Sequence, residues 1–161
     1  MIRDATDGDA PAIAAIYNYY VLNTIITFEE QAVSDQEMAQ RITGVYAASL
    51  PWFVWEEDGR VLGYAYAGKW KPRTAFRYCV ESSIYLDKNA TGRGLGRKLY
   101  EALVAELRAR KIHSVIGGIS LPNPASIGIS EKLGFKQIGH FREVGWKFEK
   151  WIDVGYWELI L

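Results

Sequence analysis

Three glycines alternate with other residues in the segment Thr91-Gly92-Arg93-Gly94-Leu95-Gly96-Arg97-Lys98. The segment follows an apolar stretch, Ser82 to Leu86, and opens a stretch with leucines at helical spacing, Leu95, Leu99, Leu103 and Leu107. Glycines at such a junction allow a tight turn, so that backbone N–H groups converge at a helix N-terminus, where the helix dipole also favours an anion. The segment is a candidate phosphate site, and an ordinary strand–turn–helix junction is the alternative.

The spacing of this glycine loop excludes two familiar nucleotide motifs. A P-loop requires Gly-x-x-x-x-Gly-Lys-Ser/Thr, and residues 92–98 have neither that spacing nor the hydroxyl. A dinucleotide fingerprint requires Gly-x-Gly-x-x-Gly after the first strand of the domain. Here the glycines come late in the chain, after the strand expected at the centre of the sheet.

Glu81 is the candidate general base. A carboxylate half-buried in an apolar strand can have its pKa raised toward neutrality, which suits a group that accepts a proton in catalysis. The alternative is a structural ion pair with a neighbour such as Arg77. The basic run Lys69, Lys71, Arg73 and Arg77 is either a solvated loop or a clamp for the acidic end of a substrate, because arginine binds a carboxylate through two parallel hydrogen bonds.

Other reactive residue types give weaker signals. His113 and His140 fit ordinary strand residues better than ligands or bases, because no metal-ligand spacing surrounds them. Cys79 is the only cysteine, so neither an internal disulfide nor a cysteine-based zinc site is expected, and no metal is predicted. The late aromatic residues are expected in the core, with some of them in a dimer interface: Trp146, Phe148, Trp151, Tyr156 and Trp157.

The composition bounds the class of protein. A chain of 161 residues with 49% apolar residues fits one domain, residues 1–161. Nineteen Lys and Arg residues balance 19 Asp and Glu residues, so no global field favours nucleic acid or an anionic membrane as a partner. The N-terminal residues lack a signal-peptide pattern, and no apolar run approaches the ~20 residues that span a bilayer. The expected location is the cytoplasm.

The first half of the chain is expected to alternate strands and helices. Residues 1–5 predict a short strand, and residues 10–22 a helix with Asp9 as N-cap and Pro11 in its first turn. Ser34 to Glu37 fits a capping box, so a second helix is expected to run to about Ala48. Two strands, Trp52 to Glu56 and Arg60 to Lys69, are then joined by the turn Asp58-Gly59.

The second half places the candidate residues on further elements. A strand is expected over Arg77 to Leu86, a helix over about 93–110 and a strand over Ile112 to Ile119. Asn123 is a suitable cap for a helix that has Pro124 at its first position and ends at Gly134. Two last strands are predicted near 135–142 and 153–160. Strands with crossing helices indicate an α/β domain with a mixed sheet.

Two segments together resemble a known superfamily. The glycine loop and the later segment Asn123-Pro124-Ala125-Ser126-Ile127-Gly128-Ile129-Ser130, which continues to Gly134-Phe135, are similar to motifs A and B of the GCN5-related N-acetyltransferase (GNAT) superfamily. Its loop reads Arg/Gln-x-x-Gly-x-Gly/Ala, and its later helix reads Asn-x-x-Ala/Ser-x-x-x-Tyr before Gly-Phe/Tyr. The resemblance covers essentially the whole chain. It implies a mostly antiparallel sheet of about seven strands, splayed at the acetyl-CoA site and flanked by about four helices.

Further segments resemble the phosphinothricin and methionine sulfoximine acetyltransferase branch. They are Asn23 to Phe28, Pro51 to Val54, Gly63 to Arg73, Val80 to Tyr85, Gly145 to Phe148 and Trp151 to Gly155. This branch implies acetyl-CoA as donor, the α-amine of a small amino-acid analogue as acceptor, direct attack in a ternary complex, and a homodimer. Two alternatives stay open. One is acetylation of a polyamine, an aminoglycoside or a protein N-terminus, and the other is a module that binds acetyl-CoA without turnover.

The resemblance also assigns roles to individual positions. Glu81 is the general base, and Ser130 stands where the superfamily usually has the tyrosine, and this branch often a histidine, that protonates the leaving thiolate. Thr91 replaces the usual Arg/Gln at the head of the loop, and Arg93 is a candidate source of the missing charge. Acetyl-CoA would be bound by Ser83, Ile84, Tyr85, Leu86, Arg93, Gly94, Leu95, Gly96, Arg97, Lys98, Asn123 and Ser126. The acceptor would be bound by Phe28, Lys71, Arg73 and Phe76.

Overall fold

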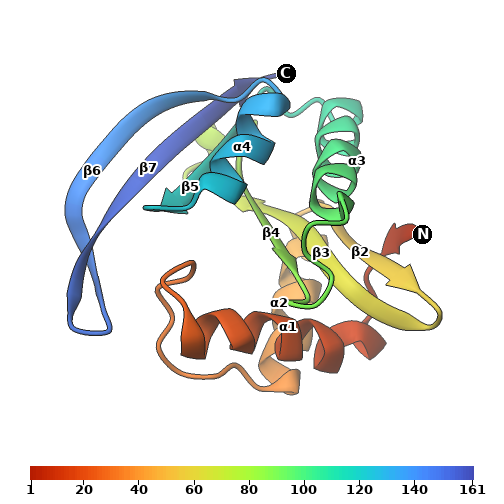
Figure 1. Ribbon diagram of the computed structural model, residues 1–161. Coiled ribbons are helices and arrows are strands. Elements are labelled where there is room, and N and C mark those ends of the chain that lie inside the picture. The colour runs from red at the N-terminus through yellow and green to blue at the C-terminus, as the bar shows by residue number, and fades with distance from the viewer.

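A seven-stranded sheet in the order β1-β2-β3-β4-β5-β7-β6 forms the centre of the computed structural model, which describes residues 1–161 (Figure 1). The strands are β1 (Ile2–Asp4), β2 (Trp52–Glu57), β3 (Arg60–Lys69), β4 (Cys79–Leu86), β5 (Ser114–Ser120), β6 (Lys136–Lys147) and β7 (Lys150–Ile160). The helices are α1 (Ala10–Asn23), α2 (Asp35–Ala47), α3 (Leu95–Ala109) and α4 (Pro124–Lys132). None of the helices is both long and apolar enough to cross a membrane.

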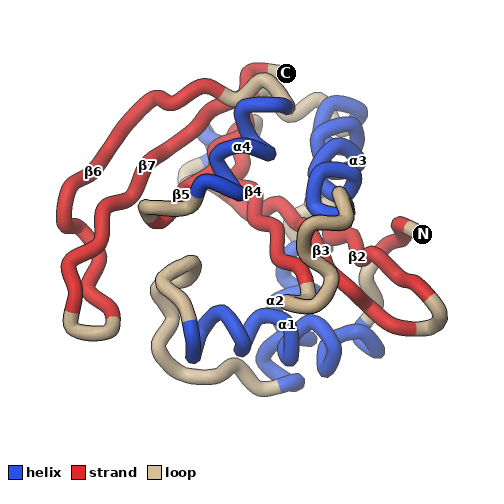
Figure 2. The backbone as a smooth tube through the Cα atoms, viewed as in Figure 1, coloured by secondary structure: helices blue, strands red, loops and turns tan.

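Helices cover both faces of the sheet, as the tube in Figure 2 makes clear. On one face, α1 and α2 bury side chains such as Ile13 and Ile42 against Trp52 and Tyr64. On the other face, the leucines of α3 pack against strand residues such as Ala65 and Val80. These strand residues alternate along the chain with the ones that face α1 and α2. Alternate residues of a strand point to opposite faces, so each strand in this part of the sheet supplies two cores.

The sheet opens between its two central strands. Every neighbouring pair of strands is antiparallel except β4 and β5, which are parallel and pair only over Cys79–Ser114, Val80–Val115 and Glu81–Ile116. Beyond Glu81, β4 continues along β3 as far as Leu86, while β5 pairs with β7. The edge of β4 that faces β5 therefore has no strand partner from Ser82 onward, and the predicted mixed, splayed sheet is confirmed.

The C-terminal hairpin is longer than the sequence indicates. Strands β6 and β7 run through residues 143–152, where a loop is predicted, and turn at Phe148 and Glu149 with positive φ of 51° and 58°. Such a turn normally carries Asn or Gly, so the sequence gives no sign of it. A bulge interrupts the pairing between Phe141 and Gly145. The long hairpin curves away from the sheet toward the loop between α1 and α2 (Figure 1).

Most predicted elements are present, and the differences lie at their ends. The strand predicted from Arg77 begins at Cys79, because residues 74–76 form a short 3-10 helix instead. Asp9 is the N-cap residue of α1, as predicted, but its side chain makes no capping hydrogen bond. Its carboxylate accepts hydrogen bonds from both terminal nitrogens of Arg3, at 2.8 Å, and from the backbone N–H of Thr6. Ser34 does cap α2, accepting from the Glu37 N–H at 3.1 Å.

Candidate functional site

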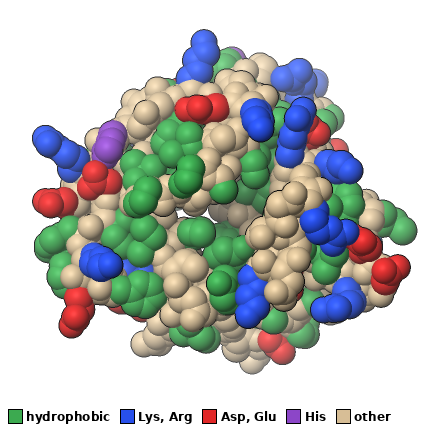
Figure 3. Space-filling view, in the orientation of Figure 1, with side chains coloured by type: hydrophobic (Ala, Val, Ile, Leu, Met, Phe, Trp, Pro, Cys, Tyr) green, Lys and Arg blue, Asp and Glu red, His purple; other side chains and the backbone are tan.

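A groove runs along the open edge of β4. It is lined by α1, the end of β4, the glycine loop and α4, has a volume of about 370 Å³, and is mostly apolar. It continues into a narrower slot between β4 and β5. The groove and the slot are continuous because Tyr85, Asn123 and Ser126 line both of them. In the space-filling view the centre of this face is hollowed and rimmed by apolar side chains (Figure 3). The splay of the sheet therefore creates a continuous channel.

Several of the residues predicted to bind the cofactor line this channel. Ile84, Tyr85 and Leu86 line the groove, Ser83 lines the slot, and Gly96 closes the groove at the start of α3. Because β4 has no partner on this edge, its backbone polar groups can bind an extended polar chain, as a neighbouring strand would. The Asn123 side chain accepts from the N–H of Ser126 at 3.2 Å and so starts α4 beside the groove.

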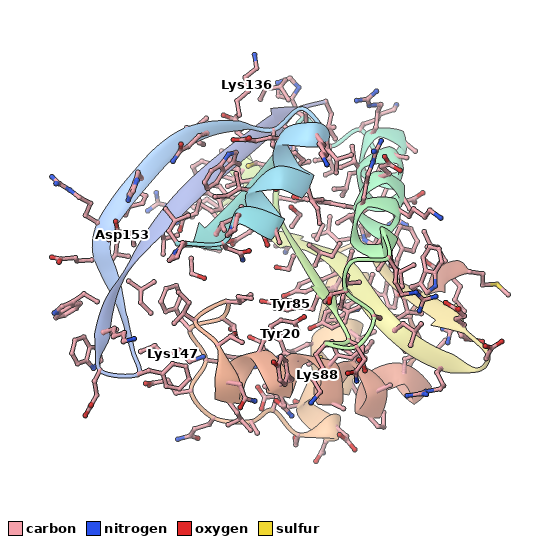
Figure 4. The ribbon with its side chains drawn as sticks, viewed as in Figure 1. Tyr20, Tyr85, Lys88, Lys136, Lys147 and Asp153 are labelled. Atoms are coloured by element: carbon pink, nitrogen blue, oxygen red, sulfur yellow. The ribbon has the colours of Figure 1, made fainter.

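Several residues of the groove were not predicted as binding residues, Tyr19, Tyr20 and Lys88 among them. Tyr20 donates a hydrogen bond to the carbonyl of Leu86 at 2.6 Å, and its ring packs 5.4 Å from that of Tyr85. Lys88 lines the same groove with its ammonium over the ring of Tyr19, at 5.1 Å (Figure 4). These residues come from α1 and from the loop after β4, so only the fold brings them to the site.

The glycine loop has the conformation that a phosphate site requires. Gly92 and Gly94 have positive φ of 75° and 76°, and no atom lies within 4 Å of a Cβ built on either glycine. Gly94 directly precedes the first residue of α3, so the loop delivers the free N–H groups of the first turn to the groove.

The basic side chains of this loop are already paired, contrary to the simplest expectation. Arg93 forms a two-pronged ion pair with Glu57, at 2.8 and 2.9 Å. Arg97 pairs with Glu101 at 2.7 Å, and the Lys98 ammonium lies 5.6 Å from the centre of the Trp55 ring. All three residues are on the surface, where ion pairs contribute little and exchange readily. In this structure the loop therefore offers an anion the backbone N–H groups at the start of α3 rather than unpaired arginine side chains.

Replacement of Gly94 by alanine is expected to raise the KM for acetyl-CoA at least about fivefold, because a residue with Cβ is strained by about 1–2 kcal/mol in this conformation. Steady-state kinetics with varied acetyl-CoA will measure this. Gly59→Ala is the matched control, since Gly59 has a φ of 72°, equally open surroundings, and a place in the β2–β3 turn. The prediction fails if both variants change that KM equally, or if neither does.

Glu81 sits where β4 and β5 part. Its neighbours across the sheet are Gly68 and Ile116, and its Oε1 lies 3.3 Å from the position that a Cβ on Gly118 would take. Burial raises the pKa of this carboxyl, and the positive charge of Lys71 lowers it by a smaller amount. Arg77 does not pair with Glu81 but donates to the carbonyl of Thr74 and lies over the Tyr78 ring. The alternative of a structural Glu81–Arg77 ion pair is therefore wrong.

The pH profile of kcat/KM is expected to show an acidic limb with a midpoint above 4.5, the ordinary value for glutamate, because burial raises the pKa of Glu81 and only the carboxylate can accept a proton. Activity is therefore lost as the pH falls through that raised value. The limb must keep its position when the acceptor amine is changed. A midpoint at or below 4.5, or a limb retained in Glu81→Gln, contradicts the prediction.

Aromatic residues lie on one side of Glu81. Tyr156 approaches Gly118, and its ring packs edge-on against Trp70 and Phe141. Burial, with a smaller contribution from the charge of Glu81, raises the pKa of the Tyr156 hydroxyl. The predicted place of Tyr156 in the core is wrong, and no signal distinguished it from Trp157, which is buried as expected. Lys71 lies over Trp70 with its ammonium 4.8 Å from the ring centre. Arg73 and Phe76 are exposed in the adjacent 3-10 segment.

Phe28 is held by a contact between two distant segments. The hairpin residue Lys147 is 1% exposed and donates from Nζ to the carbonyl of Thr27 at 2.7 Å (Figure 4). Gly145 lies directly against the Phe28 ring, which a Cβ would overlap. The hydroxyl of Thr27 is in turn 2.7 Å from that of Tyr17 on α1. The loop between α1 and α2 is therefore closed onto the β6–β7 hairpin.

Three of the late aromatic residues are exposed rather than buried. Trp146, Phe148 and Trp151 have exposed fractions of 50%, 49% and 62%, because they lie on the projecting part of the hairpin, which no helix covers. His140 is an ordinary strand residue, as expected, and its Nε2 lies 2.7 Å from the carboxylate of Asp153. No group of three His, Cys, Asp or Glu residues is arranged to hold a metal ion.

The sheet separates between two parallel strands, a glycine loop and its helix lie at the opening, and a capped helix lies opposite. These features together define an acetyltransferase of the GNAT type. The chain belongs to this family: a family model described as an acetyltransferase (GNAT) domain matches residues 2–155. The resemblance based on the two motifs is thereby confirmed.

Individual relatives cover almost the whole chain. The phosphinothricin N-acetyltransferase of Alcaligenes faecalis is 40% identical over 153 residues, covering 94% of this chain and 78% of that protein. The L-methionine sulfoximine/L-methionine sulfone acetyltransferase of Pseudomonas paraeruginosa is 38% identical over 161 residues, covering 99% and 94%. The crystal structure of a phosphinothricin acetyltransferase from Sinorhizobium meliloti in complex with acetyl-CoA matches with a TM-score of 0.97 and 37% identity, covering 100% and 88%.

Proposed function

We propose that residues 1–161 form one N-acetyltransferase domain that transfers an acetyl group from acetyl-CoA to the α-amine of a small amino-acid analogue such as phosphinothricin or methionine sulfoximine. The observation that carries this proposal is Glu81, a half-buried carboxyl with a raised pKa at the point where β4 and β5 separate. Relatives named for these two substrates over nearly the full length of the chain support the choice of acceptor.

The residues present fit acetyl-CoA. The unpaired edge of β4 suits an arm with amide groups, the open backbone of the glycine loop suits a pyrophosphate, and the groove has room for both. When bound, acetyl-CoA supplies the activated acetyl group. The chain contributes amides of β4 that can hold an oxyanion, an effect commonly worth about 3–4 kcal/mol.

Glu81 has the task of making the acceptor amine nucleophilic. At neutral pH an α-ammonium group carries the proton that prevents attack, and Glu81 accepts it. Lys71, whose charge acts on Glu81, supports recognition of the acceptor carboxylate, together with the exposed Arg73. Phe28 and Phe76 complete the proposed acceptor site.

We also infer that the chain acts as a homodimer through the exposed part of the hairpin. Six large apolar residues of β6, β7 and their turn are about half exposed: Ile138, Phe141, Val144, Trp146, Phe148 and Trp151. Contiguous exposed apolar surface favours association. Sedimentation of the wild type as a dimer and of Trp151→Glu as a monomer is expected; a monomeric wild type contradicts the inference.

A CoA-release assay with an acceptor panel tests the function. The panel contains phosphinothricin, methionine sulfoximine, common amino acids, a polyamine and a peptide with a free N-terminus. Turnover is expected with the first two compounds. Turnover with the polyamine or peptide alone would replace the proposed acceptor class, and binding of acetyl-CoA without turnover of any acceptor would leave a binding module.

A further inference from the structure

Four of the hydroxyl-bearing residues that line the slot at the end of the groove are buried. They are Ser82 on β4, Tyr100 on α3, Ser120 on β5 and Ser130 on α4. Each of these residues is more than nine-tenths buried. The slot has a volume of about 60 Å³, which is room for a small polar group. Four elements thus converge to form a polar end to a mostly apolar channel.

The hydrogen bonds among these groups leave capacity for a ligand. The hydroxyls of Tyr100 and Ser82 are 2.7 Å apart, and either can donate. Ser82 has only one other acceptor, the carbonyl of Ile116 at 3.4 Å, so its proton can turn to Tyr100 and leave the tyrosine O–H free for the slot. The Oγ of Ser120 is buried without any partner. A buried orphan hydroxyl is rare in native proteins and indicates a missing polar partner.

The slot lies next to the proposed reaction centre. Gly118, which lines the slot, is also the neighbour of the Glu81 carboxylate. Tyr85, Asn123 and Ser126 line both the slot and the groove proposed for the CoA arm. A thioester at the end of that arm therefore meets Glu81 and the four hydroxyls at the same place.

Position 130 has a serine, whose short side chain lines the slot together with Tyr100. Burial raises the pKa of Tyr100 to about 12, whereas a thiol such as that of CoA has a pKa of about 8.5. Complete transfer of the tyrosine proton to a thiolate is therefore uphill by more than three pKa units. Donation of a hydrogen bond to the anion carries no such cost and is strong in a buried site.

We propose that Tyr100, supported by the hydroxyls of Ser82, Ser120 and Ser130, donates a hydrogen bond to the sulfur of CoA as it leaves. The inference rests on the proposed function. As the new C–N bond forms, the C–S bond breaks and its electron pair stays on sulfur. The ammonium form of the acceptor loses one proton through Glu81 to solvent before it attacks, the second proton leaves the nitrogen for Glu81 as the C–S bond breaks, and the thiolate is protonated from solvent after release. Tyr100 thus stabilises, from α3, the thiolate that the residue at position 130 would protonate in most of the superfamily.

Binding of CoA alone tests this directly. The ultraviolet absorbance of the thiolate is titrated with CoA bound to the wild type and to Tyr100→Phe, a change that keeps the ring and its packing against Phe135. The bound thiol is expected to have a pKa about one unit or more lower in the wild type than in the variant. Equal pKa values overturn the proposal. The titration needs no acceptor, so failure of the proposed acceptor chemistry is a separate result.

Kinetics and two further variants complete the test. Tyr100→Phe is expected to lower kcat about tenfold to hundredfold at a nearly constant KM for acetyl-CoA, and the loss should shrink with acetyl donors whose thiol is more acidic. Ser120→Ala should shift the thiol pKa in the same direction by less, and it leaves the packing of Tyr100 untouched. Tyr46→Phe is the control, since the part-buried hydroxyl of Tyr46 donates to the carbonyls of Ala5 and Trp52, away from the slot. A loss of kcat independent of the leaving group contradicts the proposal.

Discussion

Glu81→Gln is expected to lower kcat by about 10²–10⁴-fold with little change in the KM for acetyl-CoA, because general-base catalysis contributes that much and the amide cannot accept a proton. The side chain keeps its size, so the slot and the groove keep their shape. Steady-state kinetics with each substrate varied in turn will measure both parameters. The loss should be greatest near neutral pH, where an α-amine is protonated and most needs a base.

Stability distinguishes a catalytic role for Glu81 from a structural one. Burial raises the pKa of this carboxyl, so the folded protein holds its proton more tightly than the unfolded chain. Its contribution to stability is therefore present at low pH and is lost as the pH rises through the raised value. At pH 8, Glu81→Gln removes a buried charge, and its melting temperature should equal or exceed that of the wild type.

Glu158→Gln is the control for this experiment. Glu158 lies on β7 of the same sheet, and its carboxylate accepts a hydrogen bond from Ser114 at 3.1 Å, outside the channel. Its kcat should stay within about twofold of the wild-type value, as expected for a substitution away from the site. Equal losses in both variants, or full activity of Glu81→Gln, would remove Glu81 from the mechanism.

Gly145→Ala is expected to raise the KM for the acceptor about tenfold or more and to lower the melting temperature by about 2–12 °C. The new methyl group overlaps the Phe28 ring, which must move, and overpacking of this kind costs about 1–3 kcal/mol. Displacement of Phe28 opens the contact between the hairpin and the α1–α2 loop. The KM for acetyl-CoA should change much less, because only Thr24 and Ile26 of that loop line the groove and its other lining residues come from α1, β4, the glycine loop and α4.

Gly139→Ala provides the matched comparison. Gly139 lies on the same strand, and no atom stands within 4 Å of a Cβ built there. Its acceptor KM and melting temperature should remain close to those of the wild type. If Gly145→Ala lowers the melting temperature but leaves the acceptor KM unchanged, the contact stabilises the fold without shaping the acceptor site, and Phe28 loses its proposed role.

Local patterns in the sequence predicted much of the backbone structure around the proposed acetyl-CoA groove. Ser34 and Asn123 cap their helices through hydrogen bonds to residues three positions away, and Gly94 turns the chain directly into α3. The turn at Asp58 and Gly59 has both residues at positive φ, as the sequence indicated. Each of these features depends on backbone torsions and bonds within a few residues, so a single sequence reveals it.

The aromatic residues beside Glu81 and three of the four buried hydroxyls of the slot were not predicted, because their positions depend on contacts between distant segments. The late aromatic residues illustrate the difference. Their apolar character predicted burial, but whether Trp151 or Trp157 is covered depends on which strands lie beneath a helix. The residues of the hydroxyl slot come from β4, α3, β5 and α4, and no spacing along the chain connects them.

The sequence by itself determined the family, the mixed sheet, the glycine loop and the strand that carries Glu81. Only the tertiary structure decided that Arg93 pairs with Glu57, that Tyr100 reaches the slot, and that Lys147 bonds to Thr27 across 120 positions of the chain. The reason is physical. Caps and turns follow from local torsional preferences, whereas contacts of long range form only after the loops between them are closed and the side chains are packed.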